Sequence, residues 1–349
     1  MGAAELTLQL SNLIKAQAYS LGFDLAGITR LGPAESAGKF EGWLSKGYAG
    51  EMNYLPRGAE KRRDTRLPFP GTTSAVVVAL NYDGTTPSGP IARYARGDDY
   101  HDVMITKLDS LHRWIESHLS REIRGKAYVD TGPILERDLA RKAGLGWFGK
   151  NTNLINPGIG SYFFIGSLLL DLELEADAPF EADRCGTCTR CLDACPTQAL
   201  VEPRVLDATR CISYLTIEAR GAIPVELRES VGSLVYGCDI CQEVCPWNIS
   251  FSRELSAPEL APREDSMNPK LDEILLDDEE EFRNRFRSSP IKRAKRRGLA
   301  RNIAVAMGNR GDPANVVALT RVLSDDSDAM VREHVVWALE KLGAGASGD

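Results

Sequence analysis

The chain has 349 residues, of which 43% are hydrophobic and 26% charged, as expected of a globular protein with two or three domains. Its 49 acidic residues outnumber its 42 basic residues, and this balance argues against nonspecific nucleic-acid binding by the whole surface. No apolar run approaches the roughly 18–20 residues of a membrane span, so we expect no membrane association.

Apolar periodicity predicts alternating helices and strands in the first half of the chain. The clearest strand covers 74–82, because β-branched residues fill it and turn residues bound it. The charge run at 60–66 is interpreted as solvated surface. The other predicted strands are 24–28, 126–129 and 161–170, and the predicted helices are 4–19, 40–44, 103–122 and 134–143. This alternation indicates an α/β layered domain over residues 1–175.

Eight cysteines dominate the next part of the chain. The first four follow the spacing C-x2-C-x2-C-x3-C-P, which is typical of bacterial ferredoxins with two clusters and gives the fourth cysteine to the other cluster. A second run ends in the same C-x3-C-P, and an upstream cysteine can supply its first ligand. We therefore predict one 4Fe–4S cluster on Cys185, Cys188, Cys191 and Cys245, and another on Cys195, Cys211, Cys238 and Cys241.

Zinc, disulfides and unconnected core cysteines are the competing interpretations. Zinc chemistry requires neither the third cysteine of the first run nor the Cys-Pro endings. Disulfides need an oxidising compartment, and the sequence begins without the basic start and apolar core of a signal peptide. Unconnected core cysteines would not bunch in this way. We expect a cytoplasmic protein with two iron–sulfur clusters.

The cysteine module is predicted at about 184–248, between an acidic linker at 171–183 and a Pro-rich linker at 256–262. With parts of these linkers it forms a predicted domain over 176–262. Over 263–349 the pattern becomes helical. Segments 299–308 and 331–339 are similar and predict a short pair of HEAT-like helical repeats.

A dense basic cluster precedes these repeats. Clustered Lys and Arg bind phosphates, so we expect a nucleic-acid surface, although a helical cap with a solvated basic face is the alternative. The densest part consists of Lys292, Arg293, Lys295, Arg296 and Arg297.

Two clusters alone would make a small electron carrier, whereas here they follow about 180 residues of another domain. We infer a path on which an external donor, such as a flavodoxin or ferredoxin, passes electrons through the clusters to a redox site in the first domain. No G-x-G-x-x-G lies between a strand and a helix, so a dinucleotide site of that type is not indicated. The residues alone predict a reductase with an unidentified acceptor.

Four motifs together resemble the epoxyqueuosine reductase family, and the likeness covers nearly the whole chain. They are Tyr128-Val-Asp-Thr-Gly-Pro-Ile-Leu-Glu-Arg137, Gly144-Leu-Gly-Trp-Phe-Gly-Lys-Asn-Thr152, Ala92-Arg-Tyr-Ala-Arg-Gly-Asp-Asp-Tyr-His101 and Tyr236-Gly-Cys-Asp-Ile-Cys-Gln-Glu-Val-Cys-Pro-Trp-Asn248. The resemblance implies an α+β multidomain enzyme in which a cobalamin-binding domain precedes the cysteine module. It also implies the last step of queuosine biosynthesis, the reduction of epoxyqueuosine to queuosine at the tRNA wobble position.

The resemblance assigns the proton donor to Asp130. An alkoxide that forms as an epoxide opens needs a proton, and a carboxyl beside an apolar corrin would be desolvated, which raises its pKa. A capping role in the Thr-Gly-Pro turn is the competing interpretation for Asp130. The family's lower-ligand motif Asp-x-His-x-x-Gly is absent, because Met104 replaces its glycine, so we expect cobalt without that histidine ligand.

The resemblance also implies further cobalamin contacts. Four positions correspond to those that surround the corrin in the family, namely Arg93, Tyr94, Leu154 and Ile165. Lys150 and Asn151 are expected to contact corrin amides or substrate phosphate, with a purely structural role as the alternative.

Two other functions compete with tRNA modification. A cobalamin and iron–sulfur reductase of a small molecule, similar to reductive dehalogenases, would not need the basic helical tail. A noncatalytic electron carrier or tRNA-binding module would not need the large first domain. We expect a monomer, because the tRNA already supplies a large interface.

Overall fold

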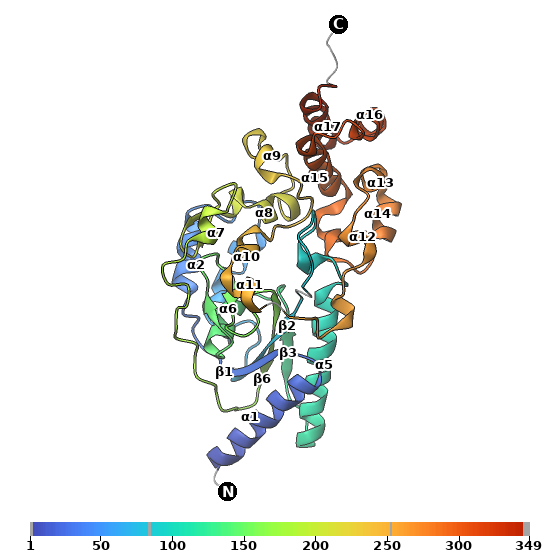
Figure 1. Ribbon diagram of the computed structural model, residues 1–349. Coiled ribbons are helices and arrows are strands. Elements are labelled where there is room, and N and C mark those ends of the chain that lie inside the picture. Colours follow the sequence, from blue (N-terminus) through green and yellow to red (C-terminus); the bar gives the residue numbers. More distant parts are fainter. Residues whose placement is uncertain (1–2, 83–84, 252, 345–349) are drawn as a thin grey trace.

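A four-stranded sheet organises the first half of the chain (Figure 1). The computed structural model describes residues 3–82, 85–251 and 253–344. Every neighbouring pair of strands is antiparallel. The strands lie in the order β1 (Leu25–Arg30), β2 (Ser74–Asn81), β6 (Phe163–Leu170) and β3 (Gly125–Tyr128).

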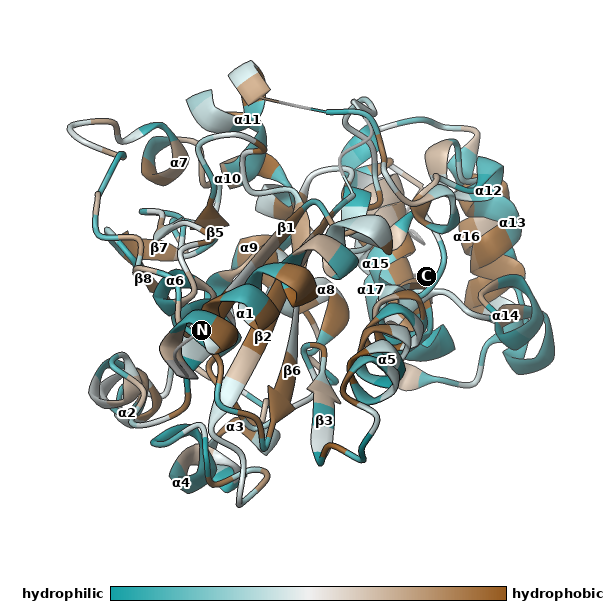
Figure 2. Ribbon diagram, turned by 90° about the horizontal axis from the view of Figure 1, so that it is seen from below, coloured by the Kyte–Doolittle hydropathy of each residue, from teal (hydrophilic) through white to brown (hydrophobic). Residues whose placement is uncertain are grey.

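Helices cover both faces of this sheet. The central strand β2 is buried along its whole length, because successive side chains point into opposite layers. Val76, Val78 and Leu80 pack with α1 (Ala3–Ser20) and α5 (Tyr100–Leu119). The alternate residues of β2 pack with α6 (Glu136–Lys142). Strands β2 and β6 are largely hydrophobic in Figure 2, whereas α1 and α5 each have one hydrophilic side. The expected mixed α/β architecture is therefore confirmed.

The helix predicted at 103–122 begins and ends earlier than expected. Asp99 is its N-cap, and the Asp99 carboxylate accepts a hydrogen bond from the His101 backbone N–H at 3.2 Å. Ser120 ends the helix in the left-handed conformation. The early start brings Tyr100 and His101 into the first turn of α5, at the edge of the site described below.

No helix within the described residues is both long and apolar enough to cross a membrane.

Short elements complete the first half of the chain. The short elements are α2 (Ala37–Ser45), α3 (Tyr54–Arg57), α4 (Ala59–Arg62), the 3-10 helix η1 (Arg93–Ala95), β4 (Trp147–Phe148) and β5 (Leu154–Ile155).

The cysteine-rich region contains short helices and one small hairpin. Helix α7 of the first cysteine run lies against α10 of the second run. The elements are α7 (Arg190–Asp193), β7 (Leu200–Glu202), β8 (Val205–Leu206), η2 (Ala208–Arg210), α8 (Ile212–Ile217), α9 (Val225–Val231), α10 (Ile240–Glu243) and α11 (Pro246–Phe251).

The C-terminal region is helical, as the sequence predicts. Helix α15 is buried over most of its length and packs on α17, and these two helices contain the similar segments 299–308 and 331–339. The elements are η3 (Pro258–Leu260), α12 (Glu264–Met267), α13 (Leu271–Leu276), α14 (Glu279–Arg285), η4 (Pro290–Ala294), α15 (Lys295–Arg310), α16 (Asn315–Asp325) and α17 (Ala329–Lys341).

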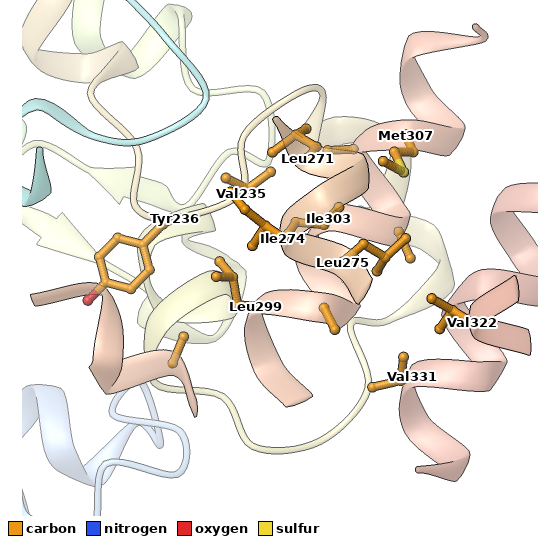
Figure 3. Close-up of a cluster of buried hydrophobic side chains, with 14 of the residues drawn as sticks. Val235, Tyr236, Leu271, Ile274, Leu275, Leu299, Ile303, Met307, Val322 and Val331 are labelled. Carbon is orange, nitrogen blue, oxygen red and sulfur yellow. The ribbon is translucent and has the colours of Figure 1, made fainter. Parts of the chain in front are cut away.

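One hydrophobic core joins this helical region to the rest of the chain. Val235 and Tyr236, which precede the second cysteine run, pack with Leu299 and Ile303 of α15 (Figure 3). The cores therefore extend across the domain boundaries expected from the sequence.

His334 on α17 predicts acid sensitivity of this region. The fully buried ring accepts a hydrogen bond from the Ile223 backbone N–H at 3.0 Å through Nε2, and its Nδ1 lies 2.7 Å from the Met330 carbonyl. Burial lowers the pKa of His334 to about 4. In the unfolded chain the His334 ring becomes protonated near pH 6.5, whereas in the folded chain it stays neutral down to about pH 4. Stability should therefore fall as the pH drops from about 6.5 to about 4, by at most about 3 kcal/mol.

The measurement is the free energy of unfolding at pH 5 and pH 7. In His334→Gln, we expect a smaller difference between the two pH values than in the wild type. The exposed His118 on α5 offers a matched control, and His118→Gln should keep the wild-type difference. Equal pH dependence in the wild type and His334→Gln would contradict the assignment.

Candidate active site and cysteine module

Asp130 lies in the loop between the edge strand β3 and helix α6. Its backbone is left-handed, with φ of 58°, a conformation that Asp tolerates better than most residues. The Asp130 backbone N–H donates to Glu136 Oε1 at 2.6 Å, and the Tyr100 hydroxyl donates to Asp130 Oδ2 at 2.9 Å. The side chain is 68% exposed. The protein alone therefore does not provide the desolvation expected from the sequence, but it holds the carboxyl in a defined place where a substrate can reach it.

Aromatic rings support this carboxyl. The Tyr100 ring stacks on Phe164 of β6 with the centroids 4.1 Å apart, and Tyr94 meets Tyr100 edge-on at 6.1 Å. Tyr236 lies tilted beside Tyr94 at 6.2 Å. Burial and the charge of Asp130 raise the pKa of Tyr100, so its phenol stays protonated and remains a donor to Asp130.

Glu136 and Arg137 lie beside Asp130, and the space around these three side chains is called the hollow below. Glu136 is only partly buried, yet burial, followed by the charge of Asp130, raises its pKa to about 8. Arg137 is exposed to solvent, yet burial lowers its pKa. Both side chains therefore reach solvent from a part of the surface where much protein surrounds them.

Two buried polar atoms near this hollow lack a partner. Among the described residues, neither Arg62 Nη1 nor His101 Nε2 has a hydrogen-bond partner. His101 Nε2 lies 3.8 Å from Asp130 Oδ2, and Arg62 Nη2 donates to the Gly132 carbonyl at 3.5 Å. Because buried polar groups normally find partners, these atoms fit a polar ligand in the hollow. Arg62 also corrects the expectation that the whole 60–66 run is solvated surface.

Three of the residues expected to bind cobalamin direct their side chains to the cysteine module. Arg93 donates to Glu243 Oε1 and to the Tyr162 hydroxyl, both at 3.0 Å, and its backbone N–H donates to Asp239. Each of the other two bonds to the backbone of a cysteine run. Lys150 Nζ donates to the carbonyls of Gly186 (2.7 Å) and Cys188 (2.9 Å), and Asn151 Nδ2 donates to that of Cys241 (3.2 Å). These contacts join the first domain to the cysteine module.

The other three expected cobalamin contacts differ in position. Tyr94 lies next to Tyr100, on the side of the hollow that faces the cysteine module. Leu154 is buried in the core beneath the sheet, and Ile165 is partly buried on β6, packed against the same core. The aliphatic side chains of Leu154 and Ile165 thus pack against protein.

The eight cysteines are all unpaired thiols, and several of them are neighbours in the fold. Cys245 lies near Cys185 and Cys188, and Cys191 lies near Cys185 and Cys245. Cys195, Cys211, Cys238 and Cys241 are also neighbours, and Cys191 lies near Cys241 as well. The division of the eight cysteines between two clusters stays a prediction.

The surroundings of these thiols suit iron–sulfur ligation. Burial raises the pKa of Cys238 to about 12, and it also raises the pKa of Cys211 and Cys241. Crowded buried thiolates need compensating positive charge, which iron supplies. The Trp147 indole N–H lies 3.5 Å from Cys185 Sγ, and the Ala199 backbone N–H donates to Cys195 Sγ at 3.3 Å. Such donors stabilise charge on ligand sulfur.

The basic residues predicted to bind tRNA fall into two groups. Lys292, Arg293, Lys295 and Arg297 are exposed. Arg293 forms two hydrogen bonds with Glu218, at 3.0 and 2.8 Å, and Lys292 pairs with Asp99 at 2.8 Å. Arg296 is different, because its side chain is 15% exposed and pairs with the partly buried Asp326 at 2.6 Å. The Arg296 charge is therefore largely neutralised by Asp326 within the fold.

Several residues of the hollow were not singled out from the sequence. Tyr100, Glu136 and Arg137 lie inside motifs that carry the family resemblance, so a signal for them was present. Arg62 had no such signal, because its burial depends on contact with the distant 130–135 loop.

Comparison with known proteins supports this picture. Residues 184–248 match a family model described as a 4Fe-4S double cluster binding domain, and residues 62–131 match one described as Epoxyqueuosine reductase QueG, DUF1730. Epoxyqueuosine reductase of Xanthomonas campestris pv. campestris is 41% identical over 341 residues, which cover 95% of each chain.

Two solved structures are similar over 96% of this chain and 90% of theirs, each with a TM-score of 0.87. One is an epoxyqueuosine reductase with a tRNA-Tyr epoxyqueuosine-modified tRNA stem loop, at 34% identity. The other, at 32% identity, is the Bacillus subtilis epoxyqueuosine reductase with its aspartate catalytic loop swung out of the active site. Given this likeness over nearly its full length, the chain belongs to the epoxyqueuosine reductase family.

Proposed function

We propose that this chain is an oxidoreductase that reduces epoxyqueuosine to queuosine at the wobble position of tRNA. The observation that carries the proposal is Asp130, an exposed carboxyl that accepts a hydrogen bond from a phenol in a hollow beside the cysteine module. Full-length similarity to epoxyqueuosine reductases, one of them solved with a modified tRNA stem loop, supports the substrate. The aspartate-bearing catalytic loop of the Bacillus subtilis protein supports Asp130 as the acid.

The reduction converts an epoxide into an alkene and water, with two electrons and two protons consumed. The oxygen keeps the electron pair of each C–O bond that breaks, so it must receive protons. Asp130 would donate the first proton as the ring opens, which prevents a free alkoxide. The Tyr100 hydroxyl would then stabilise the carboxylate that remains. A second proton from solvent lets the oxygen leave as water.

We further propose that cobalamin binds in the hollow beside Tyr94 and Asp130. When bound, it would supply the strongly nucleophilic reduced metal that delivers electrons to the epoxide carbon. The unpartnered His101 Nε2 and Arg62 Nη1 fit the amide groups of a corrin, as acceptor and donor respectively. Leu154 and Ile165 would contribute backbone and packing contacts. Arg93, Lys150 and Asn151 would act indirectly, by holding the cysteine module against the hollow.

The cysteine module would carry electrons from an external donor, such as a flavodoxin or ferredoxin. We assign one 4Fe–4S cluster to the group that contains Cys185 and the other to the group that contains Cys238. The second group lies nearer to the hollow, because a Cβ on Gly237 would lie 3.4 Å from the Tyr94 ring. Electrons would therefore leave through this second cluster.

The C-terminal helices would hold the tRNA. We propose that they form a HEAT-like repeat whose exposed basic residues contact phosphates, which position the RNA but carry little sequence information. The three proposed functional units are 1–175 for cobalamin and catalysis, 176–262 for the clusters and 263–349 for tRNA. We propose that one monomer suffices, since all three units surround a single hollow.

Lys295 and Arg296 test this tRNA surface. Lys295 is exposed and has no ion-pair partner within the described part of the chain. Lys295→Glu should weaken tRNA binding several-fold and lower the salt slope by about one. Arg296→Glu should instead lower the unfolding temperature, because it leaves Asp326 without its cation. Filter binding at several salt concentrations and thermal unfolding check both results, and unchanged binding by Lys295→Glu would contradict the surface.

The decisive test of the activity uses protein loaded with clusters and cobalamin without oxygen. It is incubated with a strong reductant and tRNA that carries epoxyqueuosine, and the nucleosides are then weighed. We expect the modified base to lose one oxygen atom only when cobalamin is present. An unchanged mass with a fully loaded protein would favour a reductase of a small molecule, which the comparisons do not otherwise favour.

A further inference from the structure

Glu136 is the first residue of α6 and the partner of the Asp130 backbone. Its Oε1 accepts the Asp130 N–H at 2.6 Å from six positions further along the chain. Strand β3 ends at Tyr128, so the sheet no longer supplies an acceptor for this N–H. The carboxyl of Glu136 thus accepts the hydrogen bond of the Asp130 backbone in place of a neighbouring strand.

The conformation of Asp130 makes this partner important. At φ of 58°, a residue with a Cβ occupies a less favourable region than in an extended chain, and surrounding contacts must hold it there. Two contacts do so. Glu136 holds the backbone N–H, and Tyr100 holds the carboxyl at 2.9 Å. Tyr100 alone would leave the backbone free to relax.

We propose that Glu136 is a positioning residue, which keeps Asp130 in its left-handed conformation so that the carboxyl points at the substrate. This inference rests on the function proposed above, in which Asp130 is the acid. It adds that Glu136 orients Asp130. Glu136 does not itself touch the reacting atoms in this scheme.

An uncharged acceptor should be enough for this role. Tyr100, Asp130, Arg137 and Arg62 are the titratable and charged groups that face Glu136 from α5, the 130 loop, α6 and α4. Burial, assisted by Asp130, outweighs the two arginines and raises the pKa of Glu136 to about 8. Near neutral pH the carboxyl is therefore largely neutral, and its carbonyl oxygen still accepts the hydrogen bond. A glutamine has the same acceptor at the same distance from the backbone.

The test compares Glu136→Ala and Glu136→Gln by two measurements. The first is hydrogen exchange of the Asp130 amide in cluster-loaded protein without tRNA. We expect exchange at least about tenfold faster in Glu136→Ala and protection close to the wild type in Glu136→Gln. The second is turnover at saturating tRNA. Glu136→Ala should lose about 10- to 100-fold in kcat with little change in KM, because misplacement of a catalytic group by about an ångström costs that much.

Glu136→Gln should recover most of this loss. Glu122→Ala, at an exposed glutamate just after α5, is the matched control and should behave as the wild type in both measurements. Iron content checks that each variant is folded. The proposal would be overturned if Glu136→Ala protected the Asp130 amide as well as the wild type does. It would also be overturned if the Asp130 amide exchanged equally fast in Glu136→Gln and Glu136→Ala. The exchange measurement does not depend on turnover, so it separates the two proposals. If the proposed function is wrong, the wild type will protect the Asp130 amide but will not reduce epoxyqueuosine.

Discussion

Asp130→Asn is expected to lower the single-turnover rate of epoxyqueuosine reduction by about 100- to 10,000-fold, the usual contribution of a general acid. Asparagine has nearly the shape of aspartate, so it can still accept the Tyr100 hydrogen bond, and its backbone N–H can still donate to Glu136. It has no acidic proton to transfer to the opening epoxide. The measurement is a rapid-quench time course with fully loaded enzyme, followed by mass analysis of the nucleosides.

The binding measurements separate this effect from misfolding. Iron content, cobalamin content and tRNA affinity should all remain within about twofold of the wild type, because Asp130 is exposed and asparagine can keep its hydrogen bonds to Tyr100 and Glu136. Asp102→Asn, at an exposed aspartate in the first turn of α5, is a matched control and should turn over normally. A rate for Asp130→Asn within about threefold of the wild type would remove Asp130 from the mechanism.

Cys238→Ala should abolish turnover and remove one of the two clusters. Cys238 is partly buried and lies near Cys195, Cys211 and Cys241, so another side chain cannot easily take its place as ligand. A cube with three protein ligands is lost or damaged, and the electron path to the hollow is interrupted at the cluster nearer to Tyr94. We expect iron per chain to fall by about half.

Iron and sulfide assays and the electron paramagnetic resonance signal of the reduced protein measure this change. Ser230→Ala, on α9 of the same module, is a control that should keep both clusters. Normal iron content together with normal turnover in Cys238→Ala would contradict the assignment of the second cluster. Normal iron with lost turnover would also count against it, because ligand loss would then not explain the defect.

Features that depend on local spacing were predictable from the sequence. The two cysteine runs, the buried strand β2 and helices α1, α5, α15 and α17 all follow from patterns within about 20 residues. The match of residues 184–248 to a double-cluster family confirms the cysteine interpretation. The family resemblance of the motif that contains Asp130 pointed to the loop between β3 and α6, where the Asp130 carboxyl is exposed.

Features that depend on distant contacts were not predictable. Arg296 and Lys295 are neighbours in the same basic run, yet only Arg296 meets an aspartate thirty residues further along the chain. Asn151 bonds to the backbone of Cys241 across ninety residues. The charge run at 60–66 has no pattern that marks Arg62 as buried. In each case the tertiary fold, rather than the local sequence, decides whether a charge or an amide is free.

The attachment of α15 to the cysteine module has a consequence for the order in which the protein matures. Asn302 Nδ2 donates to the carbonyls of Thr216 and Val235, both at 2.8 Å, and Arg301 donates to the carbonyl of Ala219 at 3.1 Å. These carbonyls flank Cys211 and Cys238, two of the proposed cluster ligands, and their hydrogen-bond partners lie on a helix that the ribosome makes more than fifty residues later. A chain that ends before Lys295 would lack these contacts beside Cys211 and Cys238, so the backbone around these two cysteines is complete only once α15 has been synthesised.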